Sequence, residues 1–208
     1  MHERSSSIPM TLSKTANFSD KPMTRIQTNL SVYDNSWYNP GGGPVKRLIW
    51  YFCNVLFFIN PLNPFSWLKV LLLRLFGARI GQGVVIKPGV NIKYPWLLRV
   101  GDHCWIGERV WIDNLAMVTI GNHCCVSQGA LLLCGNHNYK KSTFDLIAKP
   151  IRLEDGAWVG ARAVVSPGVT IGSHAILTVQ SVATETLEPY GLYKGNPAER
   201  IRERVITT

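Results

Sequence analysis

The sequence predicts a mainly β protein in which a β-helix of short strands occupies residues 80–185. Three observations predict it: a six-residue repeat, a small residue at the fifth position of nearly every unit, and a spacing of twenty residues between groups of three units. A six-residue period differs from the 3.6-residue period of an α-helix, and it suits strands that are joined by tight corners and stacked coil on coil.

Each repeat unit begins with Ile, Val or Leu, which we expect to fill the narrow interior of the coil beside the small fifth residue. Glycine recurs at the second and fourth positions, where we expect corners with unusual backbone angles. The fourteen units begin at Ile80, Ile86, Ile92, Val100, Ile106, Ile112, Ile120, Val126, Leu132, Leu153, Val159, Val165, Ile171 and Leu177.

The spacing between units predicts where the chain leaves the coil. Ile80, Val100 and Ile120 lie twenty residues apart, so residues are inserted after every third unit. If three units make one triangular coil, all insertions leave it at the same corner. The longest is a loop at 138–152 with His137 at its root, and loops of this length are usually functional.

The chain before the repeat divides into two parts. Residues 1–30 are rich in Ser, Thr, Lys and Asn, which is typical of a disordered tail. In 31–79, an aromatic, turn-rich segment with Pro40 is followed by two apolar stretches separated by Pro61 and Pro64, which predicts a helical hairpin.

Two roles for this hairpin remain open. It can be a cap that protects the open end of the solenoid. Alternatively, residues 44–76 can lie in a membrane surface with Trp50, Tyr51 and Trp67 at the headgroup level. The apolar run at 48–59 is far shorter than the roughly twenty residues that span a bilayer.

The net charge indicates which kinds of partner the protein can bind, and the cysteine content indicates in which compartment it is found. A net charge of +9 and a pI near 9.5 suit negatively charged partners, which include nucleic acid, anionic lipid and phosphorylated ligands. The chain has no run of basic residues and no zinc-finger or RNA-recognition signature, so we expect no nucleic-acid partner. Five cysteines without a CxxC pair, and the absence of a signal-peptide pattern, favour the cytoplasm.

Four of the five histidines fall in the repeat region. His103, His123 and His174 share the fourth position of their units, and such a row can suggest zinc. The row skips a coil, however, so we interpret these three as solvated corner residues and expect no metal. His137 is out of phase with them, at the root of the long loop.

Several segments resemble known acyltransferases. The hexad repeat, the GNHN segment, EDGAWVGARAVVSPGVTIG and GLYKGNPAERIRER resemble the hexapeptide-repeat acyltransferases. More closely, YDNSWY, NPLNP, LLRLFGARIG, VVIKPGVNIKYPW, WIGERVWIDN and GNPA resemble the colanic acid biosynthesis acetyltransferases, over nearly everything after Leu30. The resemblance implies a left-handed parallel β-helix, a homotrimer, acetyl-CoA as donor, and an active site between two subunits.

The resemblance also implies roles for individual residues. His137 matches the family's histidine, and an imidazole with a pKa of about 6.5 suits a base that takes the acceptor's proton at neutral pH. Gly160 and Ala161 match the place where backbone N–H groups stabilise the oxyanion. The expected contacts to CoA are Gly160, Ala161, Thr178, Val179, Lys194, Arg200 and Arg202. At 178–181 this chain has TVQS where many relatives have a Gly-Ala-Gly-Ser run, and Glu185 replaces a common lysine.

For the acceptor, polar groups at the corner of His137 can bind sugar hydroxyls. Asp113 and Asn114 are candidates, although an Asp-Asn pair is also ordinary turn chemistry. Trp111 can stack on a sugar ring, and Asn136 can orient the histidine.

These inferences predict an O-acetyltransferase that modifies a sugar hydroxyl of an exopolysaccharide precursor, and a lipid-linked precursor is one form that this acceptor can take. N-acetylation of an amino sugar is an alternative with the same machinery. A zinc-dependent hydratase of the carbonic-anhydrase kind and a non-catalytic scaffold are others. Residues 186–208 are expected to form a C-terminal tail, and the protein is expected in the cytoplasm, with contact to the inner membrane face open.

Overall fold

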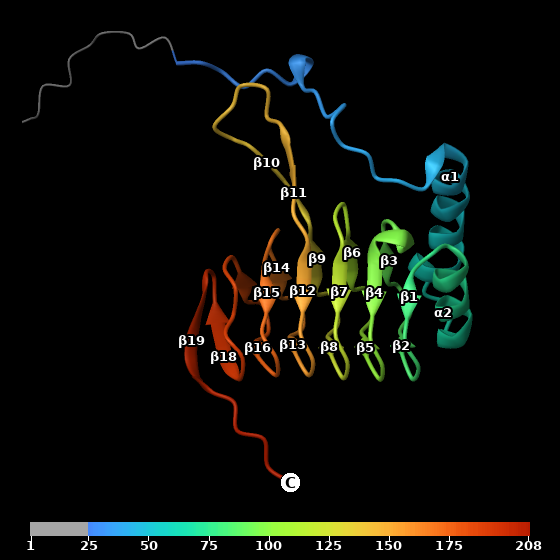
Figure 1. The fold of residues 1–208 in the computed structure, drawn as a ribbon, viewed down its shortest axis with the longest axis vertical. Coiled ribbons are helices and arrows are strands. Elements are labelled where there is room, and N and C mark those ends of the chain that lie inside the picture. Colours follow the sequence, from blue (N-terminus) through green and yellow to red (C-terminus); the bar gives the residue numbers. More distant parts are fainter. Residues whose placement is uncertain (1–24) are drawn as a thin grey trace, which may run out of the picture.

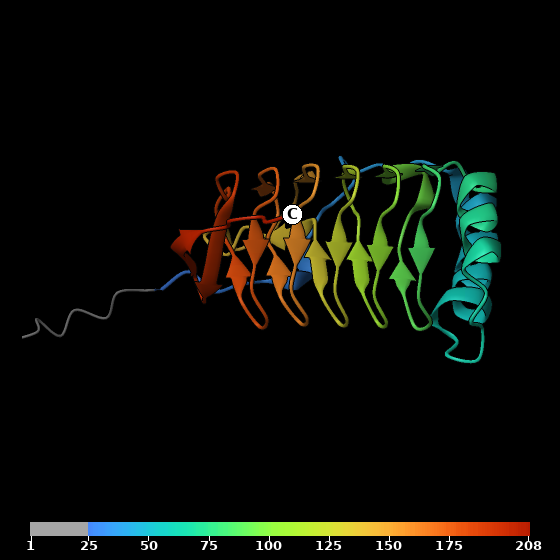
Figure 2. The same cartoon turned by 90° about the horizontal axis from the view of Figure 1, so that it is seen from below.

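The computed structural model describes residues 25–208 and confirms a mainly β fold, a parallel β-helix preceded by a short helical region (Figure 1). Strands of successive coils pair in parallel and form three sheets, one on each side of a three-sided prism (Figure 2). Five complete coils are followed by part of a sixth. Of the expected disordered tail, residues 1–24 lie outside the described residues.

Each sheet takes one strand from each of the five complete coils, and the second sheet also contains β18 and β19. The first sheet contains β1 (Arg79–Ile80), β4 (Leu98–Val100), β7 (Val118–Ile120), β12 (Ile151–Leu153) and β15 (Thr170–Ile171). The second contains β2 (Val85–Ile86), β5 (Trp105–Ile106), β8 (Cys125–Val126), β13 (Trp158–Val159), β16 (Ile176–Leu177), β18 (Gly191–Gly195) and β19 (Ala198–Glu203). The third contains β3 (Asn91–Ile92), β6 (Trp111–Asp113), β9 (Leu131–Leu133), β14 (Val164–Val165) and β17 (Val182–Ala183).

The first residue of each repeat unit points into the prism, as predicted. Val100 pairs with Ile120, and Leu153 pairs with Ile171, so that aliphatic side chains stack from coil to coil. These side chains are buried, as is Cys104 at a small fifth position. The resulting continuous apolar column stabilises the fold, because each coil buries its interior only against its neighbours.

Glycine occurs at the second and at the fourth position of the repeat unit for two different physical reasons. The fourth position has a positive φ, which is 70° at Gly156 and 55° at His103, and glycine favours this conformation. Gly101, at the second position, has no positive φ, but a Cβ there would lie 2.8 Å from the backbone of Gly121 in the next coil. The expected unusual angles are therefore right for the fourth position and wrong for the second, where close stacking of the coils excludes a side chain.

All inserted residues leave the prism where the third sheet ends and the first sheet begins, which we call the third-to-first corner. Insertions follow β3 and β6, and the long one follows β9. The first of them forms the short helix η3 (Pro95–Leu97). The prediction of a single edge for these excursions is confirmed.

The long excursion is a β-hairpin that begins earlier than the expected loop at 138–152. In it β10 (Gly135–His137) pairs antiparallel with β11 (Leu146–Ala148), and His137 lies opposite Leu146. The sequence did not reveal this hairpin because the pairing of β10 with β11 lies outside the six-residue template.

The helical region closes the N-terminal end of the prism (Figure 2). It consists of α1 (Gly43–Cys53), its π-helical continuation η2 (Asn54–Ile59), and α2 (Ser66–Leu75). The open end of a solenoid exposes strand edges that need hydrogen-bond partners. Side chains of the helices bond to each of the three sheets: Trp50 Nε1 donates to Ile92 O at 2.9 Å, Ser66 Oγ accepts from Ile86 N at 2.8 Å, and the Arg74 guanidinium donates to Ile80 O at 2.9 Å.

The last segment of the chain contains strands where we expected only a tail over 186–208. β18 continues the second sheet beside β16, and β19 folds back on it as an antiparallel partner. The backbone of Thr178 donates to Tyr193 O at 2.9 Å across this junction. The sequence did not reveal these strands because their pairing does not depend on the hexad repeat.

Residues 25–42, which we call the N-terminal arm, run from the helices along the outside of the prism to the β10–β11 hairpin (Figure 1). The arm includes the single turn η1 (Leu30–Val32). The backbone of Asn29 donates to Ser142 O at 2.8 Å, and Tyr38 Oη donates to Leu115 O at 2.7 Å. The arm therefore contacts the hairpin that carries His137.

Candidate active site

The β10–β11 hairpin holds the imidazole of His137 in one orientation. His137 Nδ1 lies 2.9 Å from the backbone oxygen of Phe144. Since a carbonyl oxygen only accepts, Nδ1 is the protonated nitrogen in the neutral imidazole, and the lone pair is then on Nε2. The arrangement leaves Nε2 able to take a proton from a ligand.

Aromatic rings fix the plane of this imidazole. The Phe144 ring stacks on it with centroids 4.4 Å apart and an interplanar angle of 8°. Tyr33, from the N-terminal arm, lies at 5.8 Å. Neither contact could be predicted from the sequence, because both depend on how the hairpin and the arm fold.

Asn136 supports the backbone of the hairpin rather than the histidine ring. Its Oδ1 accepts from the backbone N–H of His137 at 2.8 Å. Asn136 also lines a hollow of about 280 Å³ with Ile147, Lys149 and Ser166.

Asp113 lies at the root of the hairpin, at the corner predicted for it. Its Oδ1 is 2.9 Å from Lys93 Nζ, and its side chain is 10% exposed. A Cβ on Gly135 would be 3.8 Å from Asp113 Oδ2. Sequence reasoning missed Lys93, although it precedes Asp113 by twenty residues, one coil. Trp111 is 45% exposed on the outer face of the same strand.

Asn114 does not face a ligand. The side chain is fully buried, accepts from Tyr94 N at 2.9 Å, and donates to Tyr94 O at 2.6 Å and Leu97 O at 3.2 Å. All its polar atoms are engaged in holding the insertion of the neighbouring coil. The expectation that Asn114 binds the acceptor is therefore corrected, and its role is structural.

A groove of about 460 Å³ lies at a different corner, where the second sheet ends and the third begins. Four residues expected to contact the cofactor come together there, and apolar side chains make up most of the remaining wall. Its lining includes Gly160, Ala161, Thr178, Val179, Trp158 and Leu177.

Only one of the two expected oxyanion donors is available in this groove. The N–H of Gly160 donates to Leu177 O at 2.7 Å, so the oxyanion role of Gly160 is corrected. Its lack of a side chain serves coil stacking, since a Cβ would lie 2.6 Å from Val179 N. The N–H of Ala161 makes no hydrogen bond to any residue of the described part of the chain.

Basic residues lie on the strands next to the groove. Arg202 lines a hollow of about 570 Å³ that shares Trp158, Ile176 and Leu192 with the groove, so the two hollows adjoin. Lys194 and Arg200 are exposed on the same β18–β19 hairpin. The structure thus places all three predicted cations on one element.

Within one chain, the histidine and the groove do not meet. His137 extends from the third-to-first corner, whereas Ala161 follows β13 at the second-to-third corner. The predicted base therefore lies at one corner, and the predicted oxyanion donor lies with the groove at another.

The other histidines occupy the remaining corner and do not converge. His103 stacks on His123 at 5.3 Å, and His174 stacks on Tyr190 at 4.9 Å. All three histidines have positive φ, which histidine tolerates better than most residues. Among residues 25–208, no three His, Cys, Asp or Glu side chains are placed to hold one metal.

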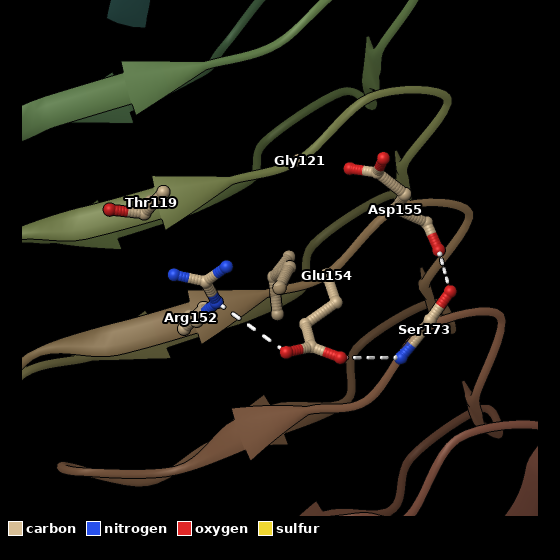
Figure 3. A pocket seen from close by; sticks show the side chains of 7 residues that line it. Thr119, Gly121, Arg152, Glu154, Asp155 and Ser173 are labelled. Atoms are coloured by element: carbon tan, nitrogen blue, oxygen red, sulfur yellow. Dashed lines mark hydrogen bonds and ion pairs between the residues drawn. The ribbon is translucent and has the colours of Figure 1, made fainter.

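A polar hollow of about 280 Å³ beside this corner is closed by its own hydrogen bonds (Figure 3). Glu154 accepts from Ser173 N at 3.0 Å and lies 3.6 Å from Arg152 Nε. The backbone N–H and side chain of Asn122 donate to Asp155 and lower the pKa of that carboxyl. These groups stabilise the corner and leave no convergent set for a ligand.

Comparisons with known proteins agree with this architecture. The family model "Hexapeptide repeat of succinyl-transferase" matches residues 150–178. A solved structure of the hexapeptide-repeat acetyltransferase VCA0836 of Vibrio cholerae, complexed with acetyl-CoA, has a TM-score of 0.64 and 26% identity, over 70% of this chain and 81% of that one. A galactoside acetyltransferase in complex with coenzyme A has a TM-score of 0.68 at 23% identity, over 78% and 82% of the two chains, and shows the fold.

A curated relative shows the family. It is the "Putative colanic acid biosynthesis acetyltransferase WcaF" of Escherichia coli strain K12, which is 39% identical over 168 residues, covering 80% of this chain and 92% of the relative. The chain therefore belongs to the WcaF family of hexapeptide-repeat acetyltransferases, with their left-handed parallel β-helix.

Proposed function

We propose that this protein transfers the acetyl group of acetyl-CoA to a sugar hydroxyl of an exopolysaccharide precursor, with His137 as general base. The observation that carries the proposal is the bond between His137 Nδ1 and Phe144 O, which leaves Nε2 as a proton acceptor. The saccharide acceptor is supported by the names of the relatives, and acetyl-CoA by its presence in the VCA0836 complex.

The proposed reaction is direct attack in a ternary complex. His137 Nε2 takes the proton of the acceptor hydroxyl as that oxygen attacks the thioester carbonyl. The Ala161 N–H stabilises the oxyanion that forms. When the C–S bond breaks, the proton on Nε2 passes to the departing thiolate, so the products are the sugar ester and free CoA.

His137 and the groove beside Ala161 lie at different corners of one chain, and this separation favours a homotrimer. His137 of one copy then faces the groove of its neighbour, which completes a site that one chain lacks. In that arrangement Thr178 and Val179 line the path of the pantetheine arm, and Lys194, Arg200 and Arg202 bind the phosphates of CoA. Trp111 and Asp113 stay proposed contacts to the acceptor.

A reducing location such as the cytoplasm is part of the proposal. All five cysteines are unpaired thiols, and burial raises the pKa of Cys53 and of Cys134 to about 11. High pKa values keep thiols protonated and unreactive.

The substitution His137→Asn tests the base. We expect kcat to fall by about 10²- to 10⁴-fold while acetyl-CoA affinity and thermal unfolding stay unchanged, because asparagine keeps a donor toward Phe144. His103→Asn is the matched control and should retain activity.

Release of free thiol with a panel of sugar, amino-sugar and lipid-linked acceptors measures turnover. A His137→Asn enzyme with near-normal kcat would exclude His137 as the base, and preference for an amino sugar would replace O-acetylation by N-acetylation.

A further inference from the structure

The outer surface of the helical region is apolar, where a surface helix is usually polar. The inner faces of these helices bury Trp50, Phe58 and Leu73 against the prism. Large apolar side chains on the opposite side nevertheless expose more than half of their surface. We call six of them the outer apolar patch: Leu48, Phe52, Leu56, Phe65, Trp67 and Leu75.

The spacing of these residues gathers them into stripes. Leu48, Phe52 and Leu56 are four residues apart along α1 and η2, and Trp67 and Leu75 lie two such steps apart on α2. Residues four apart in a helix lie on the same face. Both helices lie at the same end of the prism (Figures 1 and 2). Scattered apolar residues on a surface are ordinary, but a contiguous apolar patch marks an interaction site.

The charges of this end indicate what covers the patch. Residues 35–101 contain no Asp or Glu, although the whole chain has 13 acidic residues. Besides the buried Lys69, the same stretch carries seven basic residues with exposed or half-buried side chains: Lys46, Arg47, Arg74, Arg79, Lys87, Lys93 and Arg99. Of these, only Lys93 belongs to an ion pair within the part of the chain that the structure describes.

An apolar patch in a positive field fits an anionic lipid surface. A second copy of the same end would bring like charges together, which is unfavourable. A bilayer with anionic headgroups accepts apolar side chains at its surface and attracts Lys and Arg around them. Exposed Trp67 and Tyr51 are of the type that prefers the headgroup level.

We propose that the outer apolar patch docks the protein on an anionic bilayer surface, with α1 and α2 lying in the plane of the interface. Both helices keep their inner faces on the prism, so they present only their outer faces to lipid. No helix among residues 25–208 is both long and apolar enough to cross a bilayer. This docking goes beyond acetyl transfer and does not depend on it.

Cosedimentation of the full-length protein with vesicles tests the proposal. One set of vesicles contains phosphatidylglycerol and phosphatidylethanolamine, and the other contains phosphatidylcholine alone. Trp67→Gln is compared with Trp105→Gln, because these tryptophans are 67% and 63% exposed on different parts of the surface. Unchanged thermal unfolding of both variants verifies that they fold.

We expect binding to the anionic vesicles that weakens with added salt, and a loss of about tenfold or more in affinity for Trp67→Gln alone. Absence of binding at low salt, equal binding to both vesicle types, or equal losses in the two variants would overturn the proposal. So would a change in oligomeric state on Trp67→Gln without vesicle binding, since the patch would then join copies of the chain. None of these readouts involves acetyl transfer, so failure of the proposed function leaves them interpretable.

Discussion

At the residue scale, the position of one proton decides what His137 can do. The sequence predicted this histidine from its place at the root of the excursion, but the tautomer depends on the carbonyl oxygen of Phe144, seven residues further along the chain. That partner is set by the turn of the hairpin. In the turn, Lys141 and Thr143 bond to the Asp145 carboxylate and lower its pKa.

Asn114 and His137 show two different uses of a polar side chain at the same corner. We expect Asn114→Ala to lower the free energy of unfolding by about 2–4 kcal/mol, because it removes three hydrogen bonds and leaves the part-buried Tyr94 N–H and Leu97 O without these partners. Urea denaturation measures this loss. Asn60→Ala is the control, since Asn60 accepts one bond in an exposed turn, and should cost less than about 1 kcal/mol. Unchanged stability with a raised KM for the acceptor would instead assign Asn114 to sugar binding.

At the scale of elements, the parts of the fold that could be predicted from the sequence are those that belong to the repeat. The stacked strands and their interior residues were predictable because one template fixes both the strand and its neighbour in the next coil. The hairpin at His137 and the strands β18 and β19 were not, because they pair outside the template and their partners depend on the folded chain. The same limit applies to the Gly160 N–H, whose bond to Leu177 O is a contact between coils.

The helical cap contains a lysine that makes its stability depend on pH. Lys69 is fully buried, its Nζ donates to Asn63 O at 2.8 Å, and burial lowers its pKa below the usual 10.5. Between the lowered folded-state pKa and 10.5 the unfolded chain binds the proton that the folded chain has released. Stability must therefore rise with pH in this window, and the cost of burying the charge is fully present below it.

Lys69→Met should remove this rise. Urea midpoints measured from neutral pH into the alkaline range should show wild type gaining stability relative to Lys69→Met as pH increases. Lys87→Met, at an exposed lysine in the first coil, should leave the difference from wild type constant. A constant difference for Lys69→Met as well would show that Lys69 keeps its proton when buried.

At the scale of the whole molecule, the prism explains why the chemistry is divided. All insertions share the third-to-first corner, which places His137 there, while the groove beside Ala161 forms between coils at another corner. The resemblance to known acetyltransferases predicted a shared site. The fold supports it through a physical reason, since a rigid solenoid cannot bring two of its own corners together.

Mixing two inactive variants tests this division most directly. His137→Asn removes the base, and Ala161→Trp fills the groove, so neither variant alone should transfer acetyl groups. After equal amounts are unfolded together and refolded, random assembly should give roughly a quarter of the subunit interfaces an intact histidine facing an open groove. The account predicts that thiol release returns to about that fraction of the wild-type rate, whereas a mixture as inactive as its components would contradict a site shared between copies.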